Sequence, residues 1–284
     1  MKKTAAFVLA SVVILFFLVD PGFAALPRYE ITDLGTLGSG AEYAMLKFQG
    51  THTQPLRVPA DYQTIQAAID AAVDGDVVIV APGLYSGDGN RDIDFNGKAI
   101  TVRSIDPNDP NIVAATIIDC NGTETDMHRG FYFHNDEDAN SLLDGFTITN
   151  GYMHGYPEPA NGGGGICCEQ SSPTILNCTI THNSAGRAGG GIFCNFSSNP
   201  RIANCNINEN WVVSDGGGVF CYRSSPTIIN CVIKSNIALF EGGGVYCHEN
   251  SRAIINNCII ADNMASYYKG RGIMCRVISH RFPA

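Results

Sequence analysis

The sequence predicts an all-β solenoid, a chain wound into stacked coils, and three observations predict it. The first is repetition, because the chain contains four near-copies of one segment that begin at Gly163, Gly189, Gly216 and Gly242. The second is a fixed period, since an Asn-Cys pair recurs in these copies at steps of 27, 26 and 27 residues. The third is composition, because 31 glycines and one tryptophan suit a turn-rich β architecture. A fixed period of this length is typical of a solenoid.

Each near-copy is expected to form one coil of three short strands. In the copy from Gly216 the three runs read GGGVFC, PTIIN and CVIKSN. Alternation along each strand places its apolar residues on one face. The side chains expected to point inward in this copy are those of Val219, Cys221, Ile228, Cys231 and Ile233. Strands this short are stable only when each pairs in parallel with its equivalent in the next coil.

Nine of the eleven cysteines recur with the repeat and are expected to form two ladders inside the stack. The ladders are Cys168, Cys194, Cys221, Cys247, Cys275 and Cys178, Cys205, Cys231, Cys258. The coil spacing of about 4.8 Å lies within disulfide range. Stacked side chains point in parallel, however, so the sequence favours reduced thiols that act as small apolar residues over disulfides. No metal site is expected, because no close cysteine pair has partnering histidines.

Two sets of asparagines also recur, one on each side of the third run of every copy. They are Asn177, Asn204, Asn230, Asn257 and Asn183, Asn210, Asn236, Asn263. Asparagine tolerates left-handed backbone, and stacked amides can bond from coil to coil, so both sets are expected at corners of the coil. The glycine triplets are expected to form another corner. Both patterns therefore indicate structural positions and not ligand-binding ones.

The range Met1–Ala24 is predicted to be a secretory signal peptide. Lys2 and Lys3 precede the apolar run Ala5–Val19, and small residues come before a cleavage site near Ala24. The alternative is an uncleaved anchor. No later segment is apolar enough to span a bilayer, so the mature chain is expected to be secreted or held at the cell surface.

The charge of the chain restricts its partners. The formal net charge is −9 and the isoelectric point is near 5.1. This balance argues against nucleic acid and against an anionic membrane surface as partners. An acidic surface by itself mainly keeps a protein soluble, so it does not indicate which partner binds.

The block Leu56–Asp106 predicts how the stack begins. Ile65, Ala68, Ile69 and Ala72 follow helical spacing, and the run VVIVAPG that follows is typical of a short strand. This block, with its sequence GDVVIVAPGLY, resembles the opening segment of pectin-lyase-like right-handed β-helices. The resemblance implies a right-handed parallel β-helix with an N-terminal capping α-helix. The helix would cover core side chains and strand edges that an open end exposes.

The repeats resemble those of polymorphic outer-membrane proteins, which pair a GG[GA]I motif with a later isoleucine or phenylalanine three residues before asparagine. The matching pairs are Ile180 and Asn183, Ile207 and Asn210, Ile233 and Asn236, Ile260 and Asn263. The cysteines depart from the minimal motif. The resemblance extends over Leu56–Cys275 and implies the fold alone, because parallel β-helices include lyases, hydrolases, esterases, adhesins and inert scaffolds.

The predicted organisation is therefore a signal peptide over residues 1–24, an N-terminal segment over 25–55 and a β-helix over 56–284. In the N-terminal segment, Tyr29–Ala44 resembles one partial copy of an extracellular repeat of the form YxITDLGTLGG. The last copy loses the pattern after Cys275, which predicts either an imperfect final coil or an array that is cut short, and we favour the second. The insertion Gly151–Gly162 is expected on the surface, either as part of a binding face or as a neutral loop.

One column of outward side chains is the best candidate for a binding site. Tyr132, Phe193, Phe220 and Tyr246 share one phase of the repeat. Spaced by about one coil, they could form a flat apolar strip on which sugar rings stack. Tyr222, Arg223 and His248 would then lie at its rim. The other interpretation, which we favour, is that the loops Ser184–Ala188 and Ile237–Glu241 fold over the strip and bury it.

A second group of polar residues gathers in the early coils. It consists of Asp88, Arg91, Asp92, Asp94, Arg103, Asp119, His128, Arg129 and the run Asp136 to Asp138. Solvated turns are the favoured interpretation of this group, and a site on these coils is the alternative. The repeats themselves carry neither the calcium-binding acidic cluster with an arginine or lysine base of pectate lyases nor the two aspartates and arginine of pectin esterases.

Two functions therefore remain open. The first is a secreted or cell-surface β-helix that binds a polysaccharide or another cell-surface component without catalysis and without a cofactor. The second is a polysaccharide-active enzyme of the pectate-lyase or pectin-lyase-like class, which would use Ca²⁺. Three acidic groups and an arginine or lysine that converge on one sheet would favour the second.

Overall fold

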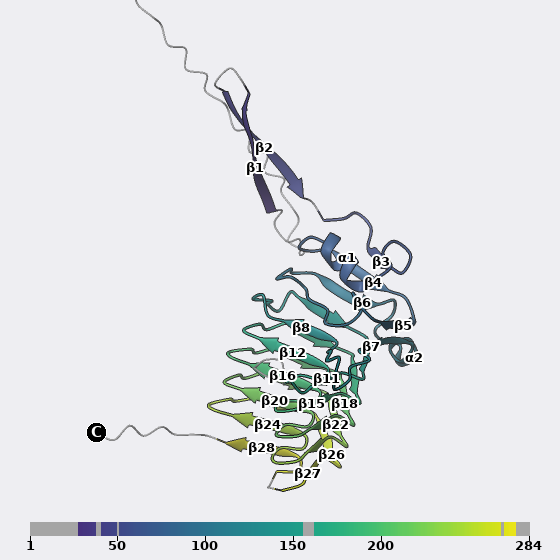
Figure 1. The fold of residues 1–284 in the computed structure, drawn as a ribbon, viewed down its shortest axis with the longest axis vertical. Helices are drawn as coiled ribbons and strands as arrows, with labels where there is room; N and C mark the ends of the chain where they lie inside the picture. The colour runs from purple at the N-terminus through teal and green to yellow at the C-terminus, as the bar shows by residue number, and fades with distance from the viewer. Residues whose placement is uncertain (1–27, 38–40, 50, 156–161, 268–269, 277–284) are drawn as a thin grey trace, which may run out of the picture.

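The computed structural model describes residues 28–37, 41–49, 51–155, 162–267 and 270–276, and it confirms the predicted parallel β-helix (Figure 1). The predicted signal peptide Met1–Ala24 lies outside the described residues, as do residues 156–161 of the insertion. Ahead of the solenoid, β1 (Arg28–Leu37) and β2 (Ala41–Gln49) form an antiparallel hairpin.

Four parallel sheets run along the solenoid. The first sheet contains β8 (Phe131–Phe133), β12 (Ile166–Glu169), β16 (Ile192–Asn195), β20 (Val219–Tyr222), β24 (Val245–His248) and β28 (Ile273–Arg276). The second contains β3 (Leu56–Val58), β4 (Val77–Val80), β6 (Thr101–Ser104), β9 (Leu142–Asp144), β13 (Thr174–Leu176), β17 (Arg201–Ala203), β21 (Thr227–Ile229) and β25 (Ile254–Asn256). The third contains β5 (Gly83–Ser86), β7 (Thr116–Asp119), β10 (Thr147–Thr149), β14 (Thr179–Thr181), β18 (Asn206–Asn208), β22 (Val232–Lys234) and β26 (Ile259–Ala261).

The fourth sheet departs from the expected three strands per coil. It contains β11 (Tyr152–Met153), β15 (Ser184–Ala185), β19 (Trp211–Val212), β23 (Ile237–Ala238) and β27 (Met264–Ala265). Each of these strands has two residues, so only one side chain points inward and no alternation is visible in the sequence. The inward residues Ala185, Val212 and Ala238 form a small buried cluster of their own.

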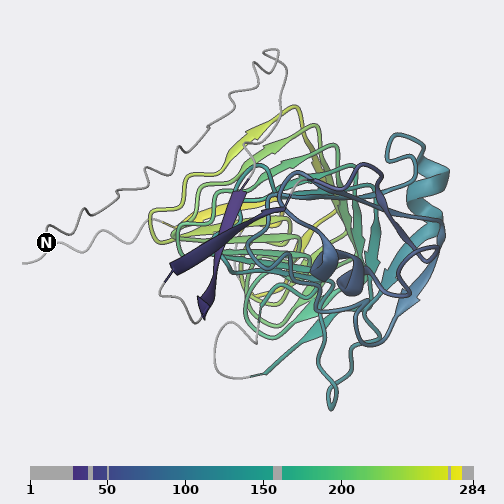
Figure 2. The same ribbon diagram turned by 90° about the horizontal axis from the view of Figure 1, so that it is seen from above.

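The inward residues predicted for the copy from Gly216 are confirmed. Val219, Cys221, Ile228 and Ile233 are fully buried in the main core, as is almost all of Cys231. Equivalent residues pair without offset, so Cys194 lies opposite Cys221 in the next coil. Seen from above, the coils superimpose around this core (Figure 2). All eleven cysteines are free thiols, as the parallel direction of stacked side chains predicts.

The predicted capping helix is also confirmed. Helix α1 (Ile65–Ala71) packs on β3 and β4 at the N-terminal end of the stack (Figure 1). The Thr64 hydroxyl accepts a hydrogen bond from the Ala67 amide and caps the helix. A second short helix, α2 (Pro110–Ala115), was not expected. Within the described part of the chain, neither helix is long and apolar enough to cross a membrane.

The asparagine ladders hold the corners of the coil. Asn204 and Asn230 adopt positive φ angles of 55° and 53°, as expected for corner residues. The second set is buried instead, and the positive φ falls one residue earlier, on Ser235 before Asn236. The buried amides bond from coil to coil, for example from Asn210 Nδ2 to Asn236 Oδ1 at 3.0 Å.

Candidate functional site

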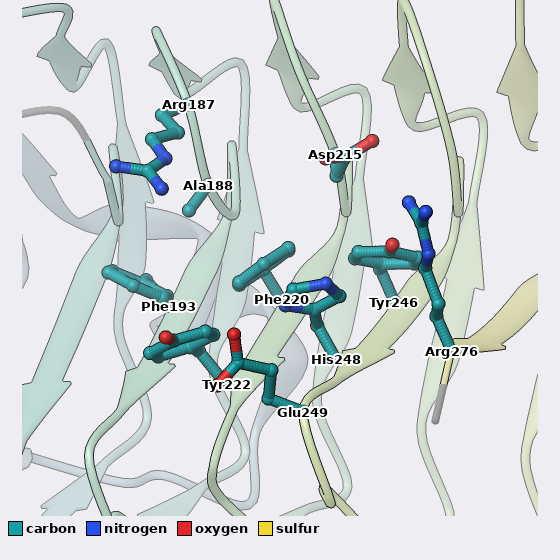
Figure 3. Close-up of a pocket in the computed structure, with 10 residues that line it drawn as sticks. All are labelled: Arg187, Ala188, Phe193, Asp215, Phe220, Tyr222, Tyr246, His248, Glu249 and Arg276. Carbon is teal, nitrogen blue, oxygen red and sulfur yellow. The ribbon is translucent and has the colours of Figure 1, made fainter. Parts of the chain in front are cut away.

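The outer face of the first sheet carries the predicted column of aromatic residues. In β16, β20 and β24 the second residue of each strand points away from the core, which places Phe193, Phe220 and Tyr246 in adjacent register positions. These three side chains form a cluster separate from the main core, together with Cys167 and Ala188. Figure 3 shows their rings in a row across neighbouring strands.

The rings contact one another and leave little exposed surface. The ring centroids of Phe193 and Phe220 are 5.5 Å apart, and those of Phe220 and Tyr246 are 5.2 Å apart, with tilted planes. Only 3%, 8% and 2% of these three residues is exposed. The turn residue Ala188 packs against them, and Glu241 Oε2 accepts a hydrogen bond from the Tyr246 hydroxyl at 2.7 Å. The turns therefore cover the column, which is the second of the two alternatives, and no flat strip is present here.

Tyr132 occupies the same column but has a separate environment. Its hydroxyl donates to Glu169 Oε2 at 2.6 Å, and the Arg129 guanidinium lies 4.7 Å from its ring centroid. Burial, and then this hydrogen bond to Glu169, raise the pKa of Tyr132 well above its usual value. Cys167 separates it from Phe193 along the column. The role of Tyr132, Phe193, Phe220 and Tyr246 in ligand binding stays a prediction.

A groove of about 180 Å³ lies where the turns meet this aromatic column. Its lining consists of Arg187, Ala188, Phe193, Asp215, Phe220, Tyr222, Tyr246, His248, Glu249 and Arg276 (Figure 3). Tyr222 and His248, predicted as rim residues, line it with stacked rings 5.7 Å apart. Arg223, the third predicted rim residue, is directed to Glu249, with Nη2 at 2.6 Å from Oε2.

A second pocket of about 400 Å³ adjoins the groove, because both are lined by Asp215 and Arg276. Phe240 and Glu241 complete its lining. We call this second space the turn pocket. The Glu241 backbone amide donates to Asp215 Oδ1 at 2.9 Å, so the two neighbouring turns that carry these residues are in direct contact. Arg276 Nη1 lies 4.0 Å from Glu241 Oε2, with its side chain more than half exposed.

Burial raises the pKa of the Asp215 carboxyl, and the neighbouring Glu241 carboxylate adds to this shift. Hydrogen bonds from the Ser214 hydroxyl and the Glu241 amide oppose it. The site therefore combines aromatic rings with hydrogen-bond donors, acceptors and charges of both signs. Such a surface can bind a ligand that has apolar faces and many hydroxyl groups.

Sequence reasoning missed Arg187, Asp215, Phe240, Glu241 and Arg276. Four of these lie in the turns between the fourth and first sheets, where the copies differ from one another. Asp215 and Glu241 each directly precede a glycine triplet. The sequence interpretation included the loops Ser184–Ala188 and Ile237–Glu241 as a possible cover over the column, but nothing in the repeat pattern identified their side chains as part of a site.

The early polar residues are only partly brought together. His128 Nδ1 bonds to Asp92 Oδ2, and its Nε2 lies 2.9 Å from Asp126 Oδ1. Arg91 approaches Asp88 and Asp126 at 3.4 Å each. These contacts pair the side chains with one another.

The other early residues serve turns. Glu137 is buried and accepts from the Gly97 and Asn135 amides, and Arg103 donates to two carbonyls of its own segment. Asp119 accepts from the Asn121 amide. In the described ranges, no group of three or more His, Cys, Asp or Glu side chains is arranged to hold a metal ion.

These features define the class of the protein: a solenoid with a capped N-terminal end and a groove along the outer face of one sheet. Residues 100–277 match the family model described as the right handed beta helix region, and the chain belongs to this family. Comparison with curated proteins and with solved structures finds no significant match.

Proposed function

We propose that this β-helix protein is exported and binds a polysaccharide, without cleaving it, along the groove beside β16, β20 and β24. The composition of the groove lining is the observation that supports the proposal. Phe220 and Tyr246 line the groove together with the polar residues Tyr222, His248 and Arg276. Sugars present apolar ring faces and hydroxyl groups together, which is the combination that such a lining accommodates.

The direction of the groove supports an extended ligand. Its lining residues come from successive coils, so the same kind of surface repeats along the solenoid axis. A stacked array offers long regular surfaces rather than one deep pocket. A polysaccharide can contact several coils at once, and the predicted signal peptide at 1–24 would bring the protein to where such polymers occur.

A polysaccharide-cleaving enzyme is the second candidate, and the presence of both Asp215 and Glu241 in the lining of the turn pocket favours it. Glycoside hydrolysis uses a pair of carboxyl groups, one of which has a raised pKa and acts as the acid. The pKa of Asp215 is raised by burial. This arrangement differs from the calcium-dependent lyase expected as the enzyme alternative, which requires an acidic cluster that holds the metal.

Binding and cleavage can be separated in one experiment. The purified mature chain is immobilised on a glycan array, and the same polysaccharides are assayed in solution for reducing ends and, with calcium, for unsaturated products. We expect retention on the array without either product. Release of reducing ends that Asp215→Asn abolishes would establish the hydrolase, and unsaturated products from polygalacturonate would establish the lyase. Retention of no glycan at all would refute the binding proposal.

The location of the binding surface is tested with two histidine variants. His248→Ala removes a groove side chain and should weaken binding about 2- to 10-fold, the value of one hydrogen bond or ring contact. His182→Ala removes an exposed histidine that is paired with Glu209 and does not line the groove. It is the matched control and should bind like the wild type.

A further inference from the structure

The turns between the fourth and first sheets carry a second aromatic feature that the groove does not explain. Phe240 and Tyr267 occupy equivalent positions, each two residues after the end of β23 and β27. The equivalent residues in the two preceding turns are Arg187 and Ser214. The ladder of backbone hydrogen bonds continues into these turns, because the Phe240 amide donates to Ser214 O at 3.0 Å and the Tyr267 amide to Leu239 O at 2.9 Å.

The two rings are exposed, unlike those of the buried column. Phe240 is 37% exposed and Tyr267 is 71% exposed, while their centroids are 5.7 Å apart. The backbone hydrogen bonds fix the position of this exposed aromatic pair, which therefore presents an ordered apolar surface. The strip predicted over Phe193 and Phe220 is buried, whereas the pair formed by Phe240 and Tyr267 on the neighbouring turns is accessible.

Polar groups that can recognise hydroxyls surround this surface. Phe240 lines the turn pocket together with Asp215, Glu241 and Arg276. Carboxylates accept hydrogen bonds from sugar hydroxyls, and a guanidinium offers five donors. At 4.0 Å from Glu241 Oε2, Arg276 Nη1 is within ion-pair distance but beyond hydrogen-bond distance. The pocket, of about 400 Å³, has room for one sugar ring, and it shares Asp215 and Arg276 with the groove that we assign to the polysaccharide.

The charges of the turn pocket select among sugars. Two carboxyl groups, those of Asp215 and Glu241, face one guanidinium, that of Arg276. A uronic acid residue would place a further carboxylate beside them, and like charges at short distance in a partly buried pocket repel each other. A neutral or amino sugar brings no such charge.

We propose that the turn pocket is the principal sugar-binding subsite, in which Phe240 of the lining, together with the Tyr267 ring 5.7 Å from it, contacts the ring of a sugar that carries no carboxylate. Asp215, Glu241 and Arg276 bind its hydroxyl groups. This inference rests on the proposed polysaccharide binding and identifies where binding is strongest and which sugars bind.

The test is affinity gel electrophoresis against soluble glucan, mannan, xylan and polygalacturonate. Wild-type protein should be retarded by at least one of the three neutral polymers and less by polygalacturonate. The double variant Phe240→Ala/Tyr267→Ala should lose at least 10-fold in affinity for that neutral polymer. Leu84→Ala, which truncates a side chain in a residue that is 66% exposed on β5, is the control and should bind like the wild type. Both variants should keep the wild-type melting temperature, because the altered side chains are exposed.

A charge variant tests the selectivity. Glu241→Gln keeps a hydrogen-bonding group beside Tyr246 and removes one negative charge, so it should gain affinity for polygalacturonate relative to the neutral polymer. If the neutral polymer binds the double variant and the wild type equally, the subsite is wrong while polysaccharide binding stands. If polygalacturonate binds wild type most tightly, the sugar class is wrong. If no polymer retards the wild type, the proposed function fails and the subsite with it.

Discussion

Replacing Asn236 by alanine removes one amide from the centre of the buried ladder. Asn236 Oδ1 accepts hydrogen bonds from the backbone N–H and from Nδ2 of Asn210, both at 3.0 Å. Its Nδ2 donates to Ile207 O at 2.9 Å and to Asn263 Oδ1 at 3.0 Å. Because the residue is fully buried, alanine leaves all four of these partner groups without this side chain.

The four lost hydrogen bonds determine how much stability the variant loses. A buried polar group left unsatisfied costs about 1–3 kcal/mol, and a water molecule in the vacated space can satisfy some of the four groups. We therefore expect Asn236→Ala to lower the free energy of unfolding by about 3–5 kcal/mol. Urea denaturation followed by circular dichroism measures this loss as a shift of the transition midpoint at an unchanged slope.

Asn230→Gly is the matched control in the same coil. It removes an amide of the exposed ladder, and glycine suits the positive φ of 53° at this position. The exposed amide bonds only to Asn204 and Asn257, and water can replace both contacts. The control should cost no more than about 1 kcal/mol. Equal losses for the two variants would refute the view that the buried ladder holds the coils together.

Two further predictions follow from the thiols and from the partly buried carboxyl of Asp215. In native protein, alkylation followed by mass spectrometry should modify exposed Cys275 and half-buried Cys258 ahead of the nine buried cysteines, and uniform labelling would contradict the closed core. Burial raises the pKa of Asp215 above 3.8, so the folded state binds this proton more tightly than the unfolded state. Stability from this group is therefore lost as the pH rises from the ordinary value through the raised one. Between about pH 4 and pH 7 the melting temperature of the wild type should fall relative to that of Asp215→Asn. A difference between the two that does not change with pH would contradict the raised pKa of Asp215.

The sequence predictions that the structure confirms concern positions fixed by helical spacing or by strand alternation within the repeat. Ile65, Ala68 and Ile69 repeat at helical spacing and are buried in α1. Val219 and Cys221 alternate within one strand and point into the core. In both cases the side-chain direction follows from local backbone geometry, and the repeat shows several copies of the same pattern.

The candidate site was predicted only in part, for a physical reason. The alternation correctly placed Phe193 and Phe220 on the outer face, but an outer face is exposed only if nothing folds over it. The turns that cover them hold residues such as Ala188 and Glu241, which follow two-residue strands without visible periodicity. Exposure therefore could not be deduced from the strand pattern.

The sequence by itself determined that the chain forms stacked coils, which side chains enter the core, and where the capping helix lies, because period and alternation are local properties. The tertiary structure decided the fourth sheet and the composition of the turn pocket. Asp215, Glu241 and Arg276 belong to three successive coils, the first two in turns and the third on β28, and only the stacking of the coils brings them together. Stacking gives every coil the same backbone path, so residues that differ between copies meet at positions that the repeat does not reveal.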